Sequence, residues 1–139
     1  MPKRPISADS HITEPPNCYS DHIDPTYRAT APKMVRDEKR GDTFYIDGID
    51  TPVPMGLVAA AGKRPEDIRI GGAIFDDLHR GGWDPSYRIA DQERDGIAAE
   101  LIYPTVGMLI CNHPDFDYKK ACMEAYNRWL QGYCNAAPE

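Results

Sequence analysis

The sequence predicts an α/β protein in which parallel strands alternate with helices. The predicted order along the chain is strand, long excursion, helix, strand, helix, which is the alternation of a parallel α/β fold. The second strand, at residues 97–103, is apolar at most positions on both of its faces, as is typical of a parallel strand buried on both sides. The two helices begin at residues that commonly cap helices.

The first strand lies within residues 5–14 and ends at a turn that contains Pro15 and Pro16. Residues 15–85 then form a long irregular stretch, which holds most of the prolines and glycines, with one small hairpin strand expected at 41–48. Irregular runs of this length are uncommon in compact domains and usually have a function or cover a site. We expect the stretch to lie over the mouth of the fold or to reach a second subunit.

Residues 86–139 are regular. Asp84 and Pro85 start a helix, because the carboxylate caps the first turn and proline suits the first helical position. Gly96 ends this helix, at a place where a left-handed residue is favoured. The strand that follows ends before Pro104.

A loop at residues 105–116 precedes a second, longer helix, which is capped by Asp115 or Asp117. Apolar residues recur on one face of this helix at helical spacing, which predicts packing against the sheet rather than a ligand platform. These residues are Cys122, Tyr126, Trp129, Leu130 and Tyr133.

Two strands do not complete a parallel sheet, because such a sheet needs several strands and cover on both faces. We therefore expect residues 1–139 to be the N-terminal part of one larger domain, incomplete alone. The remainder is expected as a C-terminal segment or as a separate chain.

Composition and charge narrow the classes of partner. The chain has 139 residues, with 16 Lys and Arg against 22 Asp and Glu, and a net charge of −6. This acidic balance argues against a nucleic-acid partner. The mean hydropathy is −0.58, and the apolar runs are far shorter than the roughly 20 residues of a spanning helix, so no membrane partner is expected. Without a signal-peptide pattern, the expected compartment is the cytoplasm.

Four motifs now support a family resemblance. Asp9-Ser-His-Ile-Thr-Glu-Pro15 resembles the opening metal motif of the amidohydrolase superfamily, in the branch that includes aminocarboxymuconate-semialdehyde decarboxylase and γ-resorcylate decarboxylase. Three later stretches resemble, in order, that family's helix before the second strand, the strand itself and the helix after it. They are Gly81-Gly-Trp-Asp-Pro-Ser-Tyr-Arg88, Glu100-Leu-Ile-Tyr-Pro-Thr105 and Ala125-Tyr-Asn-Arg-Trp-Leu130.

The resemblance implies a (β/α)₈ barrel of the TIM type. Such a barrel needs about 250 residues, so this chain would supply its first two strand–helix units, with a long insertion after strand 1. The family also implies a homodimer or another homo-oligomer.

Asp9 and His11 are the candidate metal ligands. Residues at the carboxyl ends of barrel strands line the active site, and alternate strand residues point the same way, so both side chains face the mouth while Ser10 points away. A carboxylate and an imidazole suit a divalent ion, with zinc as the first choice and iron or manganese as alternatives. In the family, the first metal ligand is often His and in some decarboxylases Glu. Asp9 differs from both, so the resemblance does not determine which metal ion binds. The alternative is an aspartate at the end of a strand and a hydrogen-bonded histidine, without a metal.

Other candidate residues surround this motif. Glu14 is expected to ligate the metal, to orient His11 as an outer carboxylate, or to lie in solvent. Tyr103, Thr105 and His113 are candidates for the substrate pocket, with core packing as the equal alternative for Tyr103. His79 is read as a surface residue, with a place at the substrate entrance as the alternative. The catalytic base is expected outside this chain.

The resemblance implies a metal-dependent enzyme that acts on a small molecule. Metal-activated water would hydrolyse a C–N, C–O or similar bond. The alternative within the family is non-oxidative decarboxylation, and outside catalysis it is an accessory or interaction subunit. The long insertion favours hydrolysis, because it indicates a large covered pocket rather than the tight site of a small aromatic decarboxylase.

Overall fold

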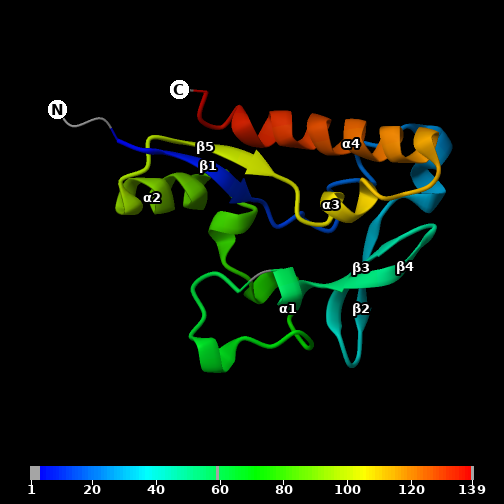
Figure 1. Cartoon of the computed structure of the whole chain (residues 1–139), viewed down its shortest axis with the longest axis horizontal. Coiled ribbons are helices and arrows are strands. Elements are labelled where there is room, and N and C mark those ends of the chain that lie inside the picture. Colours follow the sequence, from blue (N-terminus) through cyan, green and yellow to red (C-terminus); the bar gives the residue numbers. More distant parts are fainter. Residues whose placement is uncertain (1–3, 59, 139) are drawn as a thin grey trace.

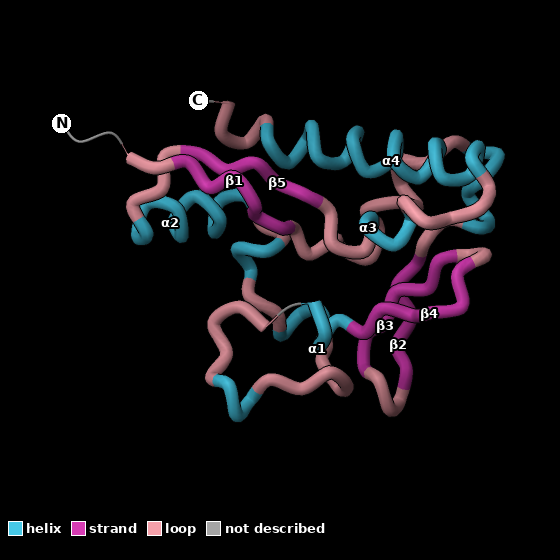
Figure 2. Tube along the Cα trace, viewed as in Figure 1, coloured by secondary structure: helices cyan, strands magenta, loops and turns pink. Residues whose placement is uncertain are grey.

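The computed structural model describes residues 4–58 and 60–138 and has a mixed α/β fold (Figure 1; Figure 2). Its strands are β1 (Ile6–His11), β2 (Lys33–Asp37), β3 (Gly41–Ile46), β4 (Ile49–Pro54) and β5 (Ala99–Tyr103). Its α-helices are α1 (Met55–Val58), α2 (Pro85–Asp95), α3 (Gly107–Ile110) and α4 (Phe116–Cys134). Short 3-10 helices lie at Pro25–Thr30, Pro65–Asp67, Phe75–Asp77 and Arg80–Gly82.

β1 and β5 form a two-stranded parallel sheet, as the alternation of elements predicts. The register pairs Ile6 with Ala99 at one end and His11 with Tyr103 at the other. An irregularity between Ser7 and Ser10 interrupts this register. Because the strands are parallel, their carboxyl ends lie at the same edge, next to α3 (Figure 1).

The helices around this sheet begin and end at the residues that the sequence indicates. Asp84 caps α2 by accepting a hydrogen bond from the backbone N–H of Ser86, and Gly96 ends the helix with a φ of 70°. Asp115 caps α4 by accepting from the N–H groups of Asp117 and Tyr118. Capping residues therefore set three of the four ends of α2 and α4.

The parallel sheet is covered on one face only, which corrects the expectation that the second strand is buried on both sides. Glu100 and Ile102 of β5 face α2 and α4 and are partly buried. On the opposite face Ile6, Leu101 and Tyr103 are 65%, 55% and 45% exposed. No element within the described residues packs over this second face.

The stretch at 15–85 is more regular than the sequence predicts. β2, β3 and β4 form an antiparallel sheet in that order, and the strand predicted at 41–48 is β3. β2 and β4 were not predicted because β2 carries Lys33, Arg36 and Asp37, and β4 carries Pro52 and Pro54. Edge strands tolerate charged residues and proline, since one side of each strand needs no partner.

The core joins the antiparallel sheet to the helices at the carboxyl ends of β1 and β5. Tyr19 and Phe44 are fully buried, and their rings meet edge to face at 6.3 Å. Ile12, Met55 and Ile110 are also buried in this cluster. The insertion therefore packs beneath the end of the parallel sheet, where the candidate metal motif lies (Figure 2). Within the described residues, no helix combines the length and the hydropathy required to cross a membrane.

Candidate functional site

Asp9 and His11 lie together at the end of β1, on the exposed face of the parallel sheet. The Asp9 Oδ1 and His11 Nε2 atoms are 3.4 Å apart. The Asp9 side chain is 84% exposed and that of His11 is 39% exposed. Ser10 turns to the other face, where its hydroxyl lies 2.8 Å from that of Ser7. The alternation around Ser10 thus brings one carboxylate and one imidazole side by side.

The His11 ring is held in one orientation by its surroundings. Its Nδ1 lies 3.0 Å from the carbonyl oxygen of Pro104, which follows β5. Because a carbonyl oxygen only accepts, Nδ1 is the donor in this contact, and Nε2 is the ring nitrogen that faces Asp9. The Tyr103 ring stands beside it at 6.1 Å. The backbone of His11 is fixed too, because Arg88 Nη2 donates to its carbonyl oxygen at 2.7 Å.

This donor set suits a divalent metal ion. Histidine ligands typically donate their second ring N–H to a backbone carbonyl or carboxylate, as His11 does to Pro104. Asp9 adds a carboxylate oxygen next to the Nε2 atom. Within residues 4–58 and 60–138, however, no three or more His, Cys, Asp or Glu side chains come together as a metal site. The described chain therefore offers a pair of ligand groups rather than a full set.

A hollow of about 190 Å³ adjoins His11, and Thr105 and His79 are among the other residues that line it. His79 precedes α2, and its Nε2 lies 2.6 Å from Asp91 Oδ2 on that helix. The hydrogen bond from His79 lowers the pKa of Asp91. Gly81 makes room for this contact, because a Cβ there would lie 2.1 Å from Asp91 Oδ2. An imidazole oriented by a carboxylate therefore lies in the same hollow as His11.

Glu14 is buried away from solvent and bonds to the backbone. Its Oε1 atom accepts hydrogen bonds at 3.0 Å from the N–H groups of Thr105 and Gly107, while the Tyr19 hydroxyl lies at 3.4 Å. Burial raises the pKa of Glu14, although the backbone hydrogen bonds oppose that shift. The burial of Glu14 corrects the expectation that it could lie in solvent, and the contacts of its Oε1 atom brace the loop after β5.

Of the three residues predicted to line the substrate pocket, Tyr103 and Thr105 lie near His11 and His113 does not. Tyr103 lies beside His11 on the exposed face. Thr105 lines the hollow and donates from its hydroxyl to the Ile12 carbonyl at 2.6 Å. His113 lies elsewhere, buried against Tyr118, with its Nε2 2.8 Å from the carbonyl oxygen of Asp47. It joins the turn between β3 and β4 to the start of α4.

The sequence did not single out Arg88 or Asp91 as part of this region. Arg88 is 77 residues from His11 in the chain, so no local spacing indicates their contact. Asp91 belongs to a run of charged residues that reads as a solvated helix face. The one signal in the sequence is that His79 precedes the start of the helix that carries Asp91. Such an arrangement is too common in proteins to indicate a site.

Comparisons with known proteins find a likeness in structure. No family model matches the sequence, and no curated protein does. Among solved structures, an amidohydrolase from Mycobacterium avium subsp. paratuberculosis K-10 is similar, with a TM-score of 0.62 and 22% sequence identity. The match covers 95% of this chain and 39% of that chain. At this identity the likeness concerns the fold, so the chain has the fold of part of an amidohydrolase structure.

Proposed function

We propose that this chain is the N-terminal part of a metal-dependent enzyme of the amidohydrolase type, which hydrolyses a C–N, C–O or similar bond in a small molecule. The single observation that carries this proposal is the pairing of Asp9 and His11 at the carboxyl end of a parallel strand. The likeness of the fold to an amidohydrolase supports it. Because the match spans 39% of that neighbour, the missing ligands and the catalytic base are assigned to the rest of a barrel.

In this proposal Asp9 and His11 hold one divalent ion, with zinc as the first choice. The Pro104 carbonyl engages Nδ1 of His11, so Nε2 is the nitrogen that binds the ion, and Asp9 offsets part of the charge of the ion. When bound, such an ion activates water or polarises a substrate oxygen. Arg88 holds the backbone of His11 in place, and Thr105 with His79 borders the hollow in which a substrate would lie.

Metal content of the full-length protein tests the assignment. We expect His11→Ala to lose most of the bound metal, because it removes the only neutral nitrogen donor of the pair. Asp9→Ala is expected to lose at least as much, since it also removes a charge. Ser10→Ala is the matched control and should keep the wild-type content, because Ser10 lies on the other face. Metal per chain is measured by plasma mass spectrometry, and folding is checked by circular dichroism.

The same experiment separates the proposal from its alternatives. Full metal occupancy in folded Asp9→Ala and His11→Ala proteins would contradict the site. Metal loss together with CO₂ release from aromatic acids, without hydrolysis of amides or esters, would favour the decarboxylase alternative. A protein that binds no metal and turns over neither class would be an accessory subunit.

A further inference from the structure

His79 lines the same hollow as His11, and a carboxylate fixes the orientation of its ring. The Nε2 atom of His79 lies 2.6 Å from Asp91 Oδ2 on α2. This hydrogen bond lowers the pKa of Asp91, so the carboxylate is ionised and accepts the bond that Nε2 donates. Arg94 Nη1 lies 2.8 Å from the other oxygen of Asp91, Oδ1. Asp91 is therefore held at both oxygens while it orients His79.

The other ring nitrogen of His79, Nδ1, is free to exchange a proton. Among the residues that the structure describes, no group forms a hydrogen bond with it. Nδ1 faces the turn at Gly62, which has a φ of 76°, and a Cβ atom there would lie 3.7 Å away. Ala61 of this turn also lines the hollow. An imidazole with one nitrogen on a carboxylate and the other unpaired is typical of a general acid or base.

The backbone joins the segment of His79 to the proposed metal motif. The Thr13 N–H group donates to the Gly82 carbonyl oxygen at 2.7 Å, and the Gly82 N–H group donates to the His79 carbonyl oxygen at 3.0 Å. Gly82 permits this close approach, because a Cβ atom there would lie 2.6 Å from Thr13 Oγ1. Thr13 follows His11 by two residues, so these bonds link the positions of the two histidines.

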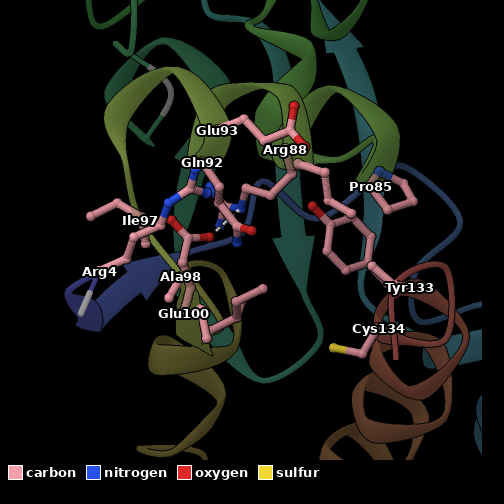
Figure 3. A pocket seen from close by; sticks show the side chains of 14 residues that line it. Arg4, Pro85, Arg88, Gln92, Glu93, Ile97, Ala98, Glu100, Tyr133 and Cys134 are labelled. Carbon is pink, nitrogen blue, oxygen red and sulfur yellow. Dashed lines mark ion pairs between the residues drawn. The ribbon is translucent and has the colours of Figure 1, made fainter. Parts of the chain in front are cut away.

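The other charged group of the hollow is not a proton donor. Arg88 lines the hollow too, but its side chain reaches toward β5, where Nε lies 2.9 Å from Glu100 Oε2 (Figure 3). A guanidinium group also keeps its proton in proteins. The described lining residues include two histidines, and His11 belongs to the proposed metal pair. His79 is therefore the residue of this hollow that can transfer a proton.

We propose that His79 donates a proton to the leaving group of the substrate, which rests on the hydrolase function proposed above. Water attacks the acyl carbon, and the bond to the leaving oxygen or nitrogen breaks with its electron pair on that atom. The leaving atom takes the proton from Nδ1 of the His79 imidazolium, which Asp91 stabilises before the transfer. The base outside this chain takes the proton of the attacking water, and solvent returns one to Nδ1. The substrate class is an ester or amide whose leaving group needs a proton.

Two acetate esters are the probes, assayed with the metal-loaded full-length protein. Phenolate is a more basic leaving group than 4-nitrophenolate and gains more from a proton donor. His79→Gln should therefore lower kcat/KM about 100-fold for phenyl acetate and much less for 4-nitrophenyl acetate. The pH profile for phenyl acetate should also lose its decline at high pH. Gln keeps a hydrogen-bond donor for Asp91 but transfers no proton, so a purely structural His79 would leave both rates unchanged.

Variants of α2 test the role of the carboxylate. Asp91→Asn should lower the rate for phenyl acetate, because a neutral amide stabilises the imidazolium less. Asp95→Asn is the matched control, since Asp95 pairs with Arg94 rather than with His79, and it should keep both rates. Equal rates in wild type and His79→Gln, an equal loss for both esters, or loss of metal in His79→Gln would overturn the proposal. Full metal content in His11→Ala would instead contradict the proposed function.

Carbethoxylation by diethyl pyrocarbonate gives a readout that needs neither turnover nor metal. Peptide mass spectrometry of the full-length protein compares His79 with His22, which is partly exposed. His79 should react faster, because the carboxylate of Asp91 makes Nδ1 more nucleophilic, and Asp91→Asn should remove this difference. If wild type hydrolyses neither ester, this measurement decides. A faster reaction that depends on Asp91 supports the proposal, and a His79 that reacts no faster than His22 would overturn it.

Discussion

At the scale of single residues, the local pattern around β1 was predictable and the environment of each side chain was not. Asp9 and His11 are two positions apart, so strand alternation alone places them on one face. The contact of His11 with Pro104 spans 93 residues, and no local rule indicates it. Glu14 belongs to the same motif, yet its carboxylate is buried.

Glu14 gives a pH-dependent prediction for stability. Burial raises its pKa above the ordinary value of 4.5, so the folded state binds the proton more tightly than the unfolded state does. The stabilisation from the protonated form is complete below pH 4.5 and is lost as the pH rises through the raised pKa. We expect wild type to lose stability relative to Glu14→Gln as the pH rises from 4.5 through this raised pKa. Urea denaturation of the full-length proteins across this range measures the difference.

Glu14→Ala provides the comparison for the structural role of the side chain. It leaves the N–H groups of Thr105 and Gly107 unpaired and should cost about 1–3 kcal/mol of the free energy of unfolding below pH 4.5, and less as the pH rises and Glu14 of the wild type ionises. A constant difference in stability between wild type and Glu14→Gln across the pH range would show that Glu14 does not titrate as its burial requires.

At the scale of elements, the predicted parts are those with strong local signals. Asp84, Gly96 and Asp115 each act within one helical turn, so α2 and α4 could be bounded from the sequence. β2 and β4 form because each pairs with β3. Their charged residues and prolines are not typical of strands, so a local sequence pattern does not predict them. α3 has four residues, too few to show helical periodicity.

The ion pair between Arg88 and Glu100 links these elements and can be tested. Arg88 on α2 reaches Glu100 on β5 and the carbonyl oxygen of His11 on β1. Arg88→Met and Glu100→Gln should each lower the free energy of unfolding by about 3 kcal/mol. Each change leaves the charge of the other residue mostly buried and without its partner. The double variant should cost less than the sum of the two. Urea denaturation in a double-mutant cycle measures this coupling, and strictly additive losses would contradict a direct interaction.

At the scale of the whole molecule, the parallel sheet has one bare face and two open edges. β1 and β5 pair only with each other within the described residues, so each presents an edge with unpaired backbone groups. Ile6 and Leu101 are exposed beside them. The sequence predicts the two parallel strands, but not the bare face, because the apolar pattern of the second strand predicts cover on both sides.

The last prediction concerns the 139-residue chain purified alone, which we expect to self-associate rather than to form a stable monomer. Open edges and an apolar face favour pairing with another copy. Leu101→Lys should reduce association, because a charge on the bare face disfavours contact there. Leu57→Lys is the matched control, since Leu57 is similarly exposed but lies on α1, away from the sheet. Light scattering after size-exclusion chromatography gives the mass, and a species of 15.6 kDa with a cooperative thermal transition would refute the prediction.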